Sequence, residues 1–159
     1  MANTVQAIPK GYHSVTPSLM VAGAAKAIEF YKKALGAEEK SRFPGPNGTL
    51  MHAEIRIGDS PVMLGDEMKD QGGLGPKALG GTPVTLFIYQ DNVDAAFKRA
   101  VDAGAKVIMP LTDQFWGDRG GCIEDPFGHR WWLCQHIRDM SERELKEAAE
   151  EFFSQPQSA

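Results

Sequence analysis

The chain lacks any long apolar run and any cluster of basic residues. Its longest hydrophobic stretches are too short to cross a bilayer, and residues 1–10 contain no apolar core followed by a cleavage site. We therefore expect a cytoplasmic protein with no membrane partner. The formal net charge is −4 and the lysines and arginines are scattered along the chain, which argues against a nucleic-acid partner.

Cysteine is scarce, and a phosphate-binding glycine loop is missing. The two cysteines, Cys122 and Cys134, fall in strand-like segments. In a cytosolic protein we expect them to be buried and reduced, although a disulfide between them stays open. No glycine-rich stretch opens a helix, as a phosphate loop requires. Neither cysteine has an orienting acid, so nucleophilic catalysis finds little support.

What is present is the composition of a folded domain. A chain of 159 residues with 42% hydrophobic and 24% charged residues can bury a substantial core. Hydrophobic periodicity and turn residues predict one order of elements that occurs twice. The first set is a strand at 12–21, a helix at 24–35 and strands at 39–43, 50–57 and 61–65; the second is a strand at 84–90, a helix at 93–103 and strands at 106–111, 122–125 and 129–136.

The two sets also share the residues that end their helices. Gly36-Ala37 and Gly104-Ala105 follow the two helices and lie about 68 residues apart. Pro17 removes a ladder donor from the first strand, which indicates either an edge strand or a bulge at that point. The sequence therefore predicts an α+β fold in which two βαβββ modules, at about 12–66 and 82–138, form a concave mixed sheet within a single domain of residues 12–138.

A further helix is predicted at 139–153, outside the repeated modules. Ser141 and Glu144 form a capping-box pattern, and apolar residues then recur at helical spacing up to Phe152 and Phe153. This apolar stripe needs cover, either from its own subunit or across a dimer. Residues 1–11 and 154–159 are expected to be loose termini.

These elements resemble the glyoxalase / bleomycin-resistance / extradiol-dioxygenase superfamily, also called the vicinal oxygen chelate superfamily. Its signatures are similar to residues 27–36 in the first helix, 92–96 at the second helix and 124–129 in the last hairpin. Within the superfamily the chain is most similar to the PhnB-like branch. The segments that support this branch are Val15-Thr16-Pro17, residues 44–46, 51–54, 80–83 and 113–119. The resemblance implies a homodimer in which each cavity forms between paired modules.

Catalytic members of the superfamily bind a divalent metal through His, Gln or Glu on the first and last strands of each module. Carried over onto this chain, those four places fall at or near Thr16, Leu64, Val84 and Trp132. Leu, Val and Trp offer no ligand for a hard or borderline cation, and neither do the neighbouring side chains. We therefore expect that the usual metal site is missing and that no cofactor is bound.

A different metal site remains an alternative. His52 and Glu54 share one face of a strand, and His136 could join them. Three convergent ligands are the minimum for an open catalytic site. In that case the protein is a metal-dependent isomerase, lyase or dioxygenase. Otherwise His52 and Glu54 form an ordinary polar pair.

The leading hypothesis is a metal-free protein that binds a small molecule, with catalysis left open. On the last strand, alternation places Trp132 on the same face as Cys134 and His136, and Trp116 lies on a loop-like stretch beside Asp118-Arg119. Aromatic walls with a few polar groups are typical of ligand pockets. A local ion pair between Arg119 and Asp118 is the competing interpretation of that arginine. The predicted ligand-binding residues are His52, Glu54, Trp116, Arg119, Trp132 and His136.

Overall fold

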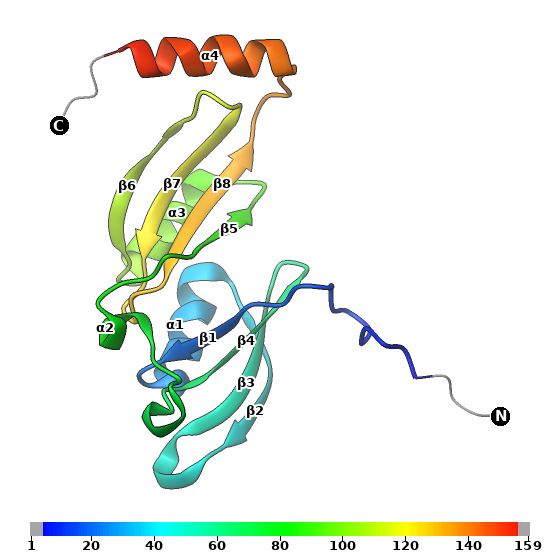
Figure 1. The fold of residues 1–159 in the computed structure, drawn as a ribbon, viewed down its shortest axis with the longest axis vertical. Helices are drawn as coiled ribbons and strands as arrows, with labels where there is room; N and C mark the ends of the chain where they lie inside the picture. Colours follow the sequence, from blue (N-terminus) through cyan, green and yellow to red (C-terminus); the bar gives the residue numbers. More distant parts are fainter. Residues whose placement is uncertain (1–4, 156–159) are drawn as a thin grey trace. The chain divides into compact units, whose positions relative to one another are not determined.

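The structure, a computed structural model, describes residues 5–155 (Figure 1). The chain folds as two compact units, one made of the residues up to 83 together with 126–129, the other of residues 84–125 and those from 130 onward. This division falls near the predicted boundary between the modules. The single domain over residues 12–138 stays a prediction. The predicted loose ends at 1–4 and 156–159 lie outside the described residues.

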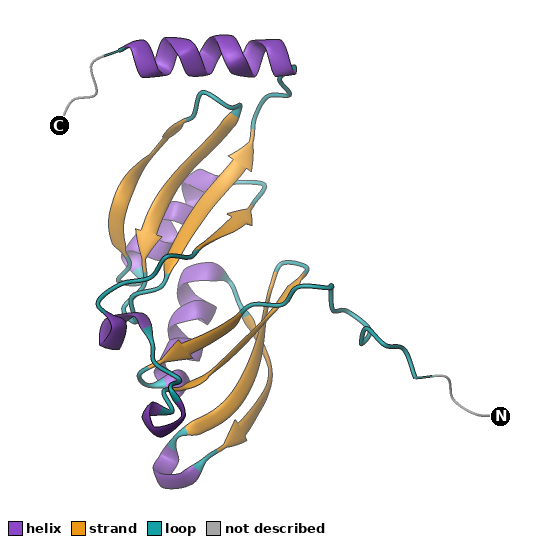
Figure 2. Ribbon diagram, viewed as in Figure 1, coloured by secondary structure: helices purple, strands orange, loops and turns teal. Residues whose placement is uncertain are grey.

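The first unit is a four-stranded sheet in the order β1-β4-β3-β2, with β1 and β4 parallel and the other pairs antiparallel (Figure 2). Helix α1 covers one face of it. Two 3-10 turns at 46–48 and 69–71 and the short helix α2 complete the unit. Its elements are β1 (Ser18–Val21), α1 (Ala24–Leu35), β2 (Glu38–Pro44), β3 (Leu50–Ile57), β4 (Ser60–Asp66) and α2 (Pro76–Leu79).

The second unit repeats this arrangement in the order β5-β8-β7-β6, with β5 and β8 parallel. Helix α3 lies behind the sheet in Figure 2, and α4 follows the last strand. The predicted α+β fold of two βαβββ modules with a C-terminal helix is confirmed. The elements are β5 (Thr85–Tyr89), α3 (Val93–Asp102), β6 (Lys106–Asp113), β7 (Asp118–Glu124), β8 (Arg130–His136) and α4 (Glu142–Ser154).

Helix α1 illustrates why these residues form these elements. Ile28 and Tyr31 recur at helical spacing and are fully buried against the sheet. Gly36 ends the helix in a left-handed conformation with φ of 68°, and its N–H is donated to the carbonyl of Tyr31. The predicted bounds of this helix agree with the structure.

Two strands begin elsewhere than the sequence indicates. Strand β1 starts at Ser18 rather than at Tyr12, because Pro17 cannot donate to the ladder. It is an edge strand, one of the two alternatives that Pro17 indicates. Strand β7 starts at Asp118 rather than at Cys122, so Asp118 and Arg119 lie in a strand and not in a loop. The C-terminal helix runs from Glu142 to Ser154, with Ser141 and Glu144 forming the predicted capping box.

Asp66, at the end of β4, connects the sheet of the first unit to α1. Its Oδ1 accepts hydrogen bonds from the N–H groups of Gly23 (2.7 Å) and Ala24 (2.9 Å), and its Oδ2 accepts one from the N–H of Leu50 (2.7 Å). The N-terminus of α1 has no cap from its own N-cap residue, Gly23. A carboxylate from a neighbouring strand therefore satisfies its free donors.

We predict that Asp66→Ala lowers the free energy of unfolding by about 2 kcal/mol, because it leaves three partly buried N–H groups without an acceptor. The measurement is urea unfolding followed by circular dichroism. Asp59→Ala is the control, since Asp59 contacts only the exposed Ser60 hydroxyl, and it should change the value by less than about 0.5 kcal/mol. Equal effects of the two changes would contradict this role.

Candidate functional site

His52 and Glu54 lie on the face of β3 that α1 does not cover. The alternate residues Ala53, Ile55 and Ile57 are buried on the helix side. The Nε2 of His52 lies 3.3 Å from Oε1 of Glu54, as expected for neighbours on one face.

Tyr12 completes this polar group. Its hydroxyl, in the segment before β1, donates a hydrogen bond to Oε2 of Glu54. That bond lowers the pKa of the Glu54 carboxyl, and the weaker bond from His52 acts in the same direction against the effect of burial. No sequence pattern indicated Tyr12 as a partner of Glu54, because Tyr12 lies 42 residues away in a stretch predicted as a strand.

The family's metal positions can be compared with the observed register. Leu64 is buried on the helix side of β4, whereas its neighbour Met63 pairs with Glu54 and shares the face of that residue. Met63 is therefore the residue at the position assigned to Leu64 by sequence. By the same register, Thr85 rather than Val84 lies on the open face, since Thr85 shares the face of Phe87 and Phe87 pairs with Trp132. The groups at these places are therefore a hydroxyl at Thr16, a thioether at Met63, a hydroxyl at Thr85 and an indole at Trp132.

This donor set does not fit a hard or borderline divalent cation, which prefers carboxylate and imidazole ligands. Within residues 5–155, no three His, Cys, Asp or Glu side chains converge in an arrangement that could hold a metal ion. His52 and Glu54 are brought together in the first unit. His136 belongs to the second unit, where it contacts Asp118 and Asp139.

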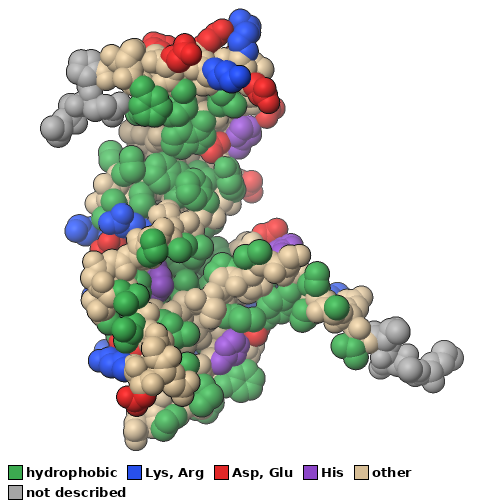
Figure 3. All heavy atoms as spheres, viewed as in Figure 1, with side chains coloured by type: hydrophobic (Ala, Val, Ile, Leu, Met, Phe, Trp, Pro, Cys, Tyr) green, Lys and Arg blue, Asp and Glu red, His purple; other side chains and the backbone are tan. Residues whose placement is uncertain are grey.

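In the second unit, Trp132 lies at the centre of an aromatic group on the sheet face opposite α3. Phe87 stacks on it with ring centroids 5.6 Å apart and an interplanar angle of 19°, and Trp116 approaches it at 6.1 Å. Tyr89 shares this face, since β5 pairs Phe87 with Trp132 and Tyr89 with Cys134. We call Phe87, Tyr89, Trp116 and Trp132 the aromatic face; Figure 3 shows hydrophobic side chains gathered over this sheet.

Trp131 occupies the opposite face, as strand alternation requires. It is fully buried, and its Nε1 donates to Oδ2 of Asp125 at 2.9 Å. Trp132 is 7% exposed, yet its Nε1 has no hydrogen-bond partner among the described residues. The indole lies directly over Gly120, where a Cβ would come within 2.5 Å of Nε1. Glycine at this position therefore leaves room for the ring.

Asp118 connects the aromatic face to its surroundings. It is 3% exposed, and its carboxylate accepts hydrogen bonds from the Tyr89 hydroxyl (3.1 Å), the Trp116 Nε1 (3.1 Å) and the His136 Nδ1 (2.8 Å). These donors come from β5, the turn before β7, and the end of β8. A buried carboxylate needs such partners because an unpaired charge is costly in a low dielectric.

Arg119 points the other way. Its guanidinium forms ion pairs with Asp94 of α3 (2.8 Å) and Asp113 of β6 (2.9 Å), on the helix side of the sheet. The ion pair with Asp118 that the sequence suggested is absent, because successive residues of a strand face opposite sides. The structure does not bring Arg119 together with Trp116 and Trp132.

The two cysteines are free and buried beside Trp132, so the expectation of buried, unpaired thiols is confirmed. Burial raises the pKa of the Cys134 thiol to about 11, and the charge of Asp118 adds to the shift. Thiols in this state are protonated at neutral pH and are poor nucleophiles.

Sequence reasoning missed Phe87, Tyr89 and the role of Asp118. The alternation of Phe87 and Tyr89 with Leu86 and Ile88 is visible in the sequence, but no face was assigned to that strand. Two of the three partners of Asp118, His136 and Tyr89, lie 18 and 29 residues away, beyond any local pattern.

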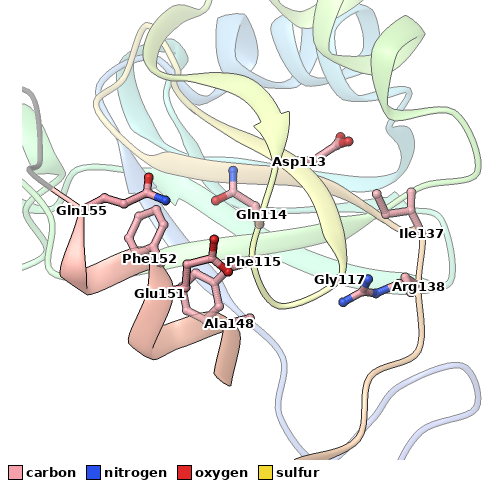
Figure 4. Close-up of a pocket in the computed structure, with 10 residues that line it drawn as sticks. All are labelled: Asp113, Gln114, Phe115, Gly117, Ile137, Arg138, Ala148, Glu151, Phe152 and Gln155. Carbon is pink, nitrogen blue, oxygen red and sulfur yellow. The ribbon is translucent and has the colours of Figure 1, made fainter. Parts of the chain in front are cut away.

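Two hollows lie elsewhere in the described residues. A cavity of about 420 Å³ lies between α4 and the turn that joins β6 to β7, and one of about 680 Å³ lies in the first unit beside Asp66. Figure 4 shows the first of them, with Phe115 and Phe152 on its walls. Neither cavity is lined by any of the six predicted ligand-binding residues. Those residues lie on open or partly covered sheet faces instead.

The comparison with known families now supports the fold. A sequence model of the Glyoxalase/Bleomycin resistance protein/Dioxygenase superfamily matches residues 12–133. The chain belongs to this superfamily. The match includes β3 with His52 and Glu54, and the aromatic face up to Trp132.

Relatives of this superfamily member span nearly its whole length. The Mycobacterium tuberculosis protein Rv0887c is 47% identical over 138 residues, which is 85% of this chain and 81% of that protein. The crystal structure of TioX from Micromonospora has a TM-score of 0.61 at 25% identity and covers 81% of this chain and 100% of that chain. The PhnB protein from Bacillus cereus has a TM-score of 0.60 at 21% identity, with 77% and 99% covered; this likeness shows the fold.

Across residues 5–155, none of the helices has the length and apolar character needed to span a membrane.

The imidazole of His136 lies between two carboxylates, with Nδ1 toward Asp118 and Nε2 3.0 Å from Asp139. The hydrogen bond with Asp118, followed by that with Asp139, raises the pKa of His136. A raised pKa in the folded state means that this contribution to stability is complete below the unfolded value of about 6.5. It is lost as the pH rises through the folded value.

We predict that Asp118→Asn lowers the pKa of His136 more than Asp139→Asn does, because the buried carboxylate provides the larger effect. The measurement is a pH titration of the His136 ring signals by NMR. Asp113→Asn is the control, since Asp113 pairs with Arg119 and does not contact His136. A His136 pKa that is unchanged in Asp118→Asn would contradict the pairing.

Proposed function

We propose that this protein binds a small organic molecule on the aromatic face of its second unit. The observation that supports the proposal is the exposure of large aromatic rings on this face. Phe87 is 54% and Tyr89 is 62% exposed, whereas a monomeric protein usually buries rings of this size. Phe87 stacks on Trp132, whose buried indole N–H has no acceptor among the described residues. A ligand that stacks on the rings and carries an acceptor would satisfy both.

The chemistry of the face favours a flat, largely apolar ligand. Offset stacking and edge contacts with Phe87 and Trp116 reward a planar molecule. The nearest arginine, Arg119, is directed to the other side of the sheet and held by two carboxylates, so it offers nothing to an anion here. Asp118 is buried, with all three of its donors supplied by the protein. Ligand affinity would therefore come from the rings rather than from charge.

Of the six predicted residues, Trp116, Trp132 and His136 remain in the proposed site, and His52 and Glu54 form a separate polar group on the open face of the first unit. Arg119 is not part of the proposed site, because it faces the other side of the sheet. A homodimer and a cytoplasmic location remain part of the proposal. The homodimer is supported by membership of a superfamily whose fold is often oligomeric. The cytoplasmic location is supported by the short apolar runs of the sequence.

A metal-dependent isomerase, lyase or dioxygenase is the alternative, and one observation favours it. His52 and Glu54 lie together on an open face, with the Glu54 pKa lowered so that the carboxylate is ready to bind a cation. Metal analysis of protein purified without a metal-affinity tag separates the two proposals. Stoichiometric Ni, Zn, Fe or Mn that is lost in His52→Ala would overturn the metal-free proposal.

We predict that the neutral fluorescent dye N-phenyl-1-naphthylamine binds to the protein and that Phe87→Ala weakens this binding about fivefold, the factor for one aromatic contact of about 1 kcal/mol. Phe87 is the residue of choice because it is exposed, so its removal leaves the core intact. The measurement is a fluorescence titration, with sedimentation of both proteins to record their oligomeric state.

Leu79→Ala is the matched control. Leu79 is 64% exposed on α2 of the first unit and is not one of the residues of the aromatic face, so its removal should leave dye affinity unchanged. If both variants weaken the dye equally, the dye is binding to exposed apolar groups in general. If Phe87→Ala dissociates an oligomer and leaves dye affinity unchanged, the face is an interface between subunits. Either result would overturn the proposed site.

A further inference from the structure

Helix α4 lies outside the repeated modules and is poorly buried, yet it is connected to the aromatic face at both of its ends. None of its residues is buried. A 13-residue helix with so little cover gains little from packing, and such elements belong to the least stable parts of a fold. Its few contacts therefore decide where it lies.

The C-terminal end of α4 reaches the aromatic face through a continuous series of rings. Phe152 and Phe153 contact Phe115 at centroid distances of 5.1 and 6.1 Å. Phe115 stands perpendicular to Trp116 at 5.0 Å, and Trp116 contacts Trp132. Figure 4 shows Phe152 of the helix and Phe115 of the turn on facing sides of the cavity beneath α4.

The N-terminal end of α4 reaches the same tryptophan by a polar route. Asp139, just before the cap residue Ser141, contacts Nε2 of His136 at 3.0 Å. His136 contacts Asp118, which accepts the indole N–H of Trp116. The two routes share no residue before they meet at Trp116.

The backbone of the turn that carries Trp116 is fixed without α4. The carbonyl of Gly117 accepts the N–H groups of Ile137 and Arg138, both at 3.0 Å. Gly117 has φ of 93°, and a Cβ there would collide with the carbonyl oxygen of Arg138. Loss of α4 contacts should therefore release the rings of Phe115 and Trp116 and leave the turn in place.

We propose that α4 is a positioning element that holds Trp116 against Trp132, so that docking of the helix and binding of a ligand on the aromatic face stabilise each other. The coupling is reciprocal, because a ligand that contacts Trp116 favours the same ring position that α4 favours. The ligand half of this inference rests on the proposed function. The part of the inference that concerns α4 is independent of any ligand, because it states only that the helix positions the Trp116 ring.

The test is the double variant Phe152→Ala/Phe153→Ala in ¹⁵N-labelled protein. The chain has three tryptophans, and Trp116→Phe identifies the indole N–H signal of Trp116. We expect this N–H to exchange with solvent about fivefold faster in the double variant, the factor for one aromatic contact of about 1 kcal/mol. The indole N–H of Trp131, bonded to Asp125, should keep its rate.

The control is Lys146→Ala/Glu150→Ala, a second pair of alanines on α4. Both side chains are exposed and take part in no ion pair among the described residues, and alanine favours the helix. This control should leave the exchange of Trp116 unchanged. An unchanged Trp116 rate in the phenylalanine variant would overturn the proposal. So would an equal acceleration at Trp131, since that would mean that the whole unit had been destabilised.

The polar route is tested separately with Asp139→Asn, which should accelerate the exchange of Trp116 by a smaller factor and add to the effect of the phenylalanine changes. Dye titration of the double variant tests the ligand half, with an expected fivefold loss for N-phenyl-1-naphthylamine. If the wild-type protein does not bind the dye, the proposed ligand site fails. Faster exchange at Trp116 in that case would still support the role of α4.

Discussion

One buried carboxylate, that of Asp118, determines the arrangement of the second unit's open face. A charge that is 3% exposed is stable only when donors surround it. The donors here are a phenol from an edge strand, an indole from a turn and an imidazole from the end of β8. Each must therefore hold its ring in one orientation. The charge converts three separate aromatic side chains into a surface with a fixed shape.

The same physical requirement appears in both units at the helix N-termini, and it relates the two modules more clearly than their sequences do. Asp66 at the end of β4 accepts the first N–H groups of α1, and Gln135 near the end of β8 accepts the N–H of Val93 at the start of α3 at 3.3 Å. These residues occupy matching places in the two sheets. If they are aligned, Met63 matches Trp132. Both modules thus have a side-chain acceptor at the helix N-terminus, whereas they differ in the residue at the matching place on the open face, Met63 or Trp132.

Elements that depend on local patterns could be predicted from the sequence, whereas contacts that depend on strand pairing could not. Periodicity predicted α1 and β3 because their patterns depend on neighbours a few residues away. It left Asp118 and Arg119 outside the predicted strands, with Arg119 as a candidate ligand-binding residue and an ion pair with Asp118 as the competing interpretation. The reason is that a glycine-rich stretch with two aromatic residues has no clear periodicity. In the structure they lie in a strand and face opposite ways, with partners on other strands and on α3. The position predicted at or near Leu64 could be assigned to Met63 only from strand pairing, which shows that Met63 and not Leu64 lies on the face that α1 does not cover.

The unpaired indole N–H of Trp132 links the fold to the proposed function. Burying an N–H without an acceptor costs free energy, and folded proteins rarely accept that cost without a reason. Here the neighbouring residues do not relieve it: Gly120 makes room for the ring, Phe87 stacks on it, and Asp118 is occupied by other donors. By contrast, Trp131 on the opposite face has Asp125 as its acceptor. Of the two adjacent tryptophans, Trp131 therefore has a hydrogen-bond acceptor for its indole N–H, whereas Trp132 has none among the described residues. The face that leaves its donor unpaired is the one that has exposed rings beside it, which is what a site that completes itself with a ligand requires.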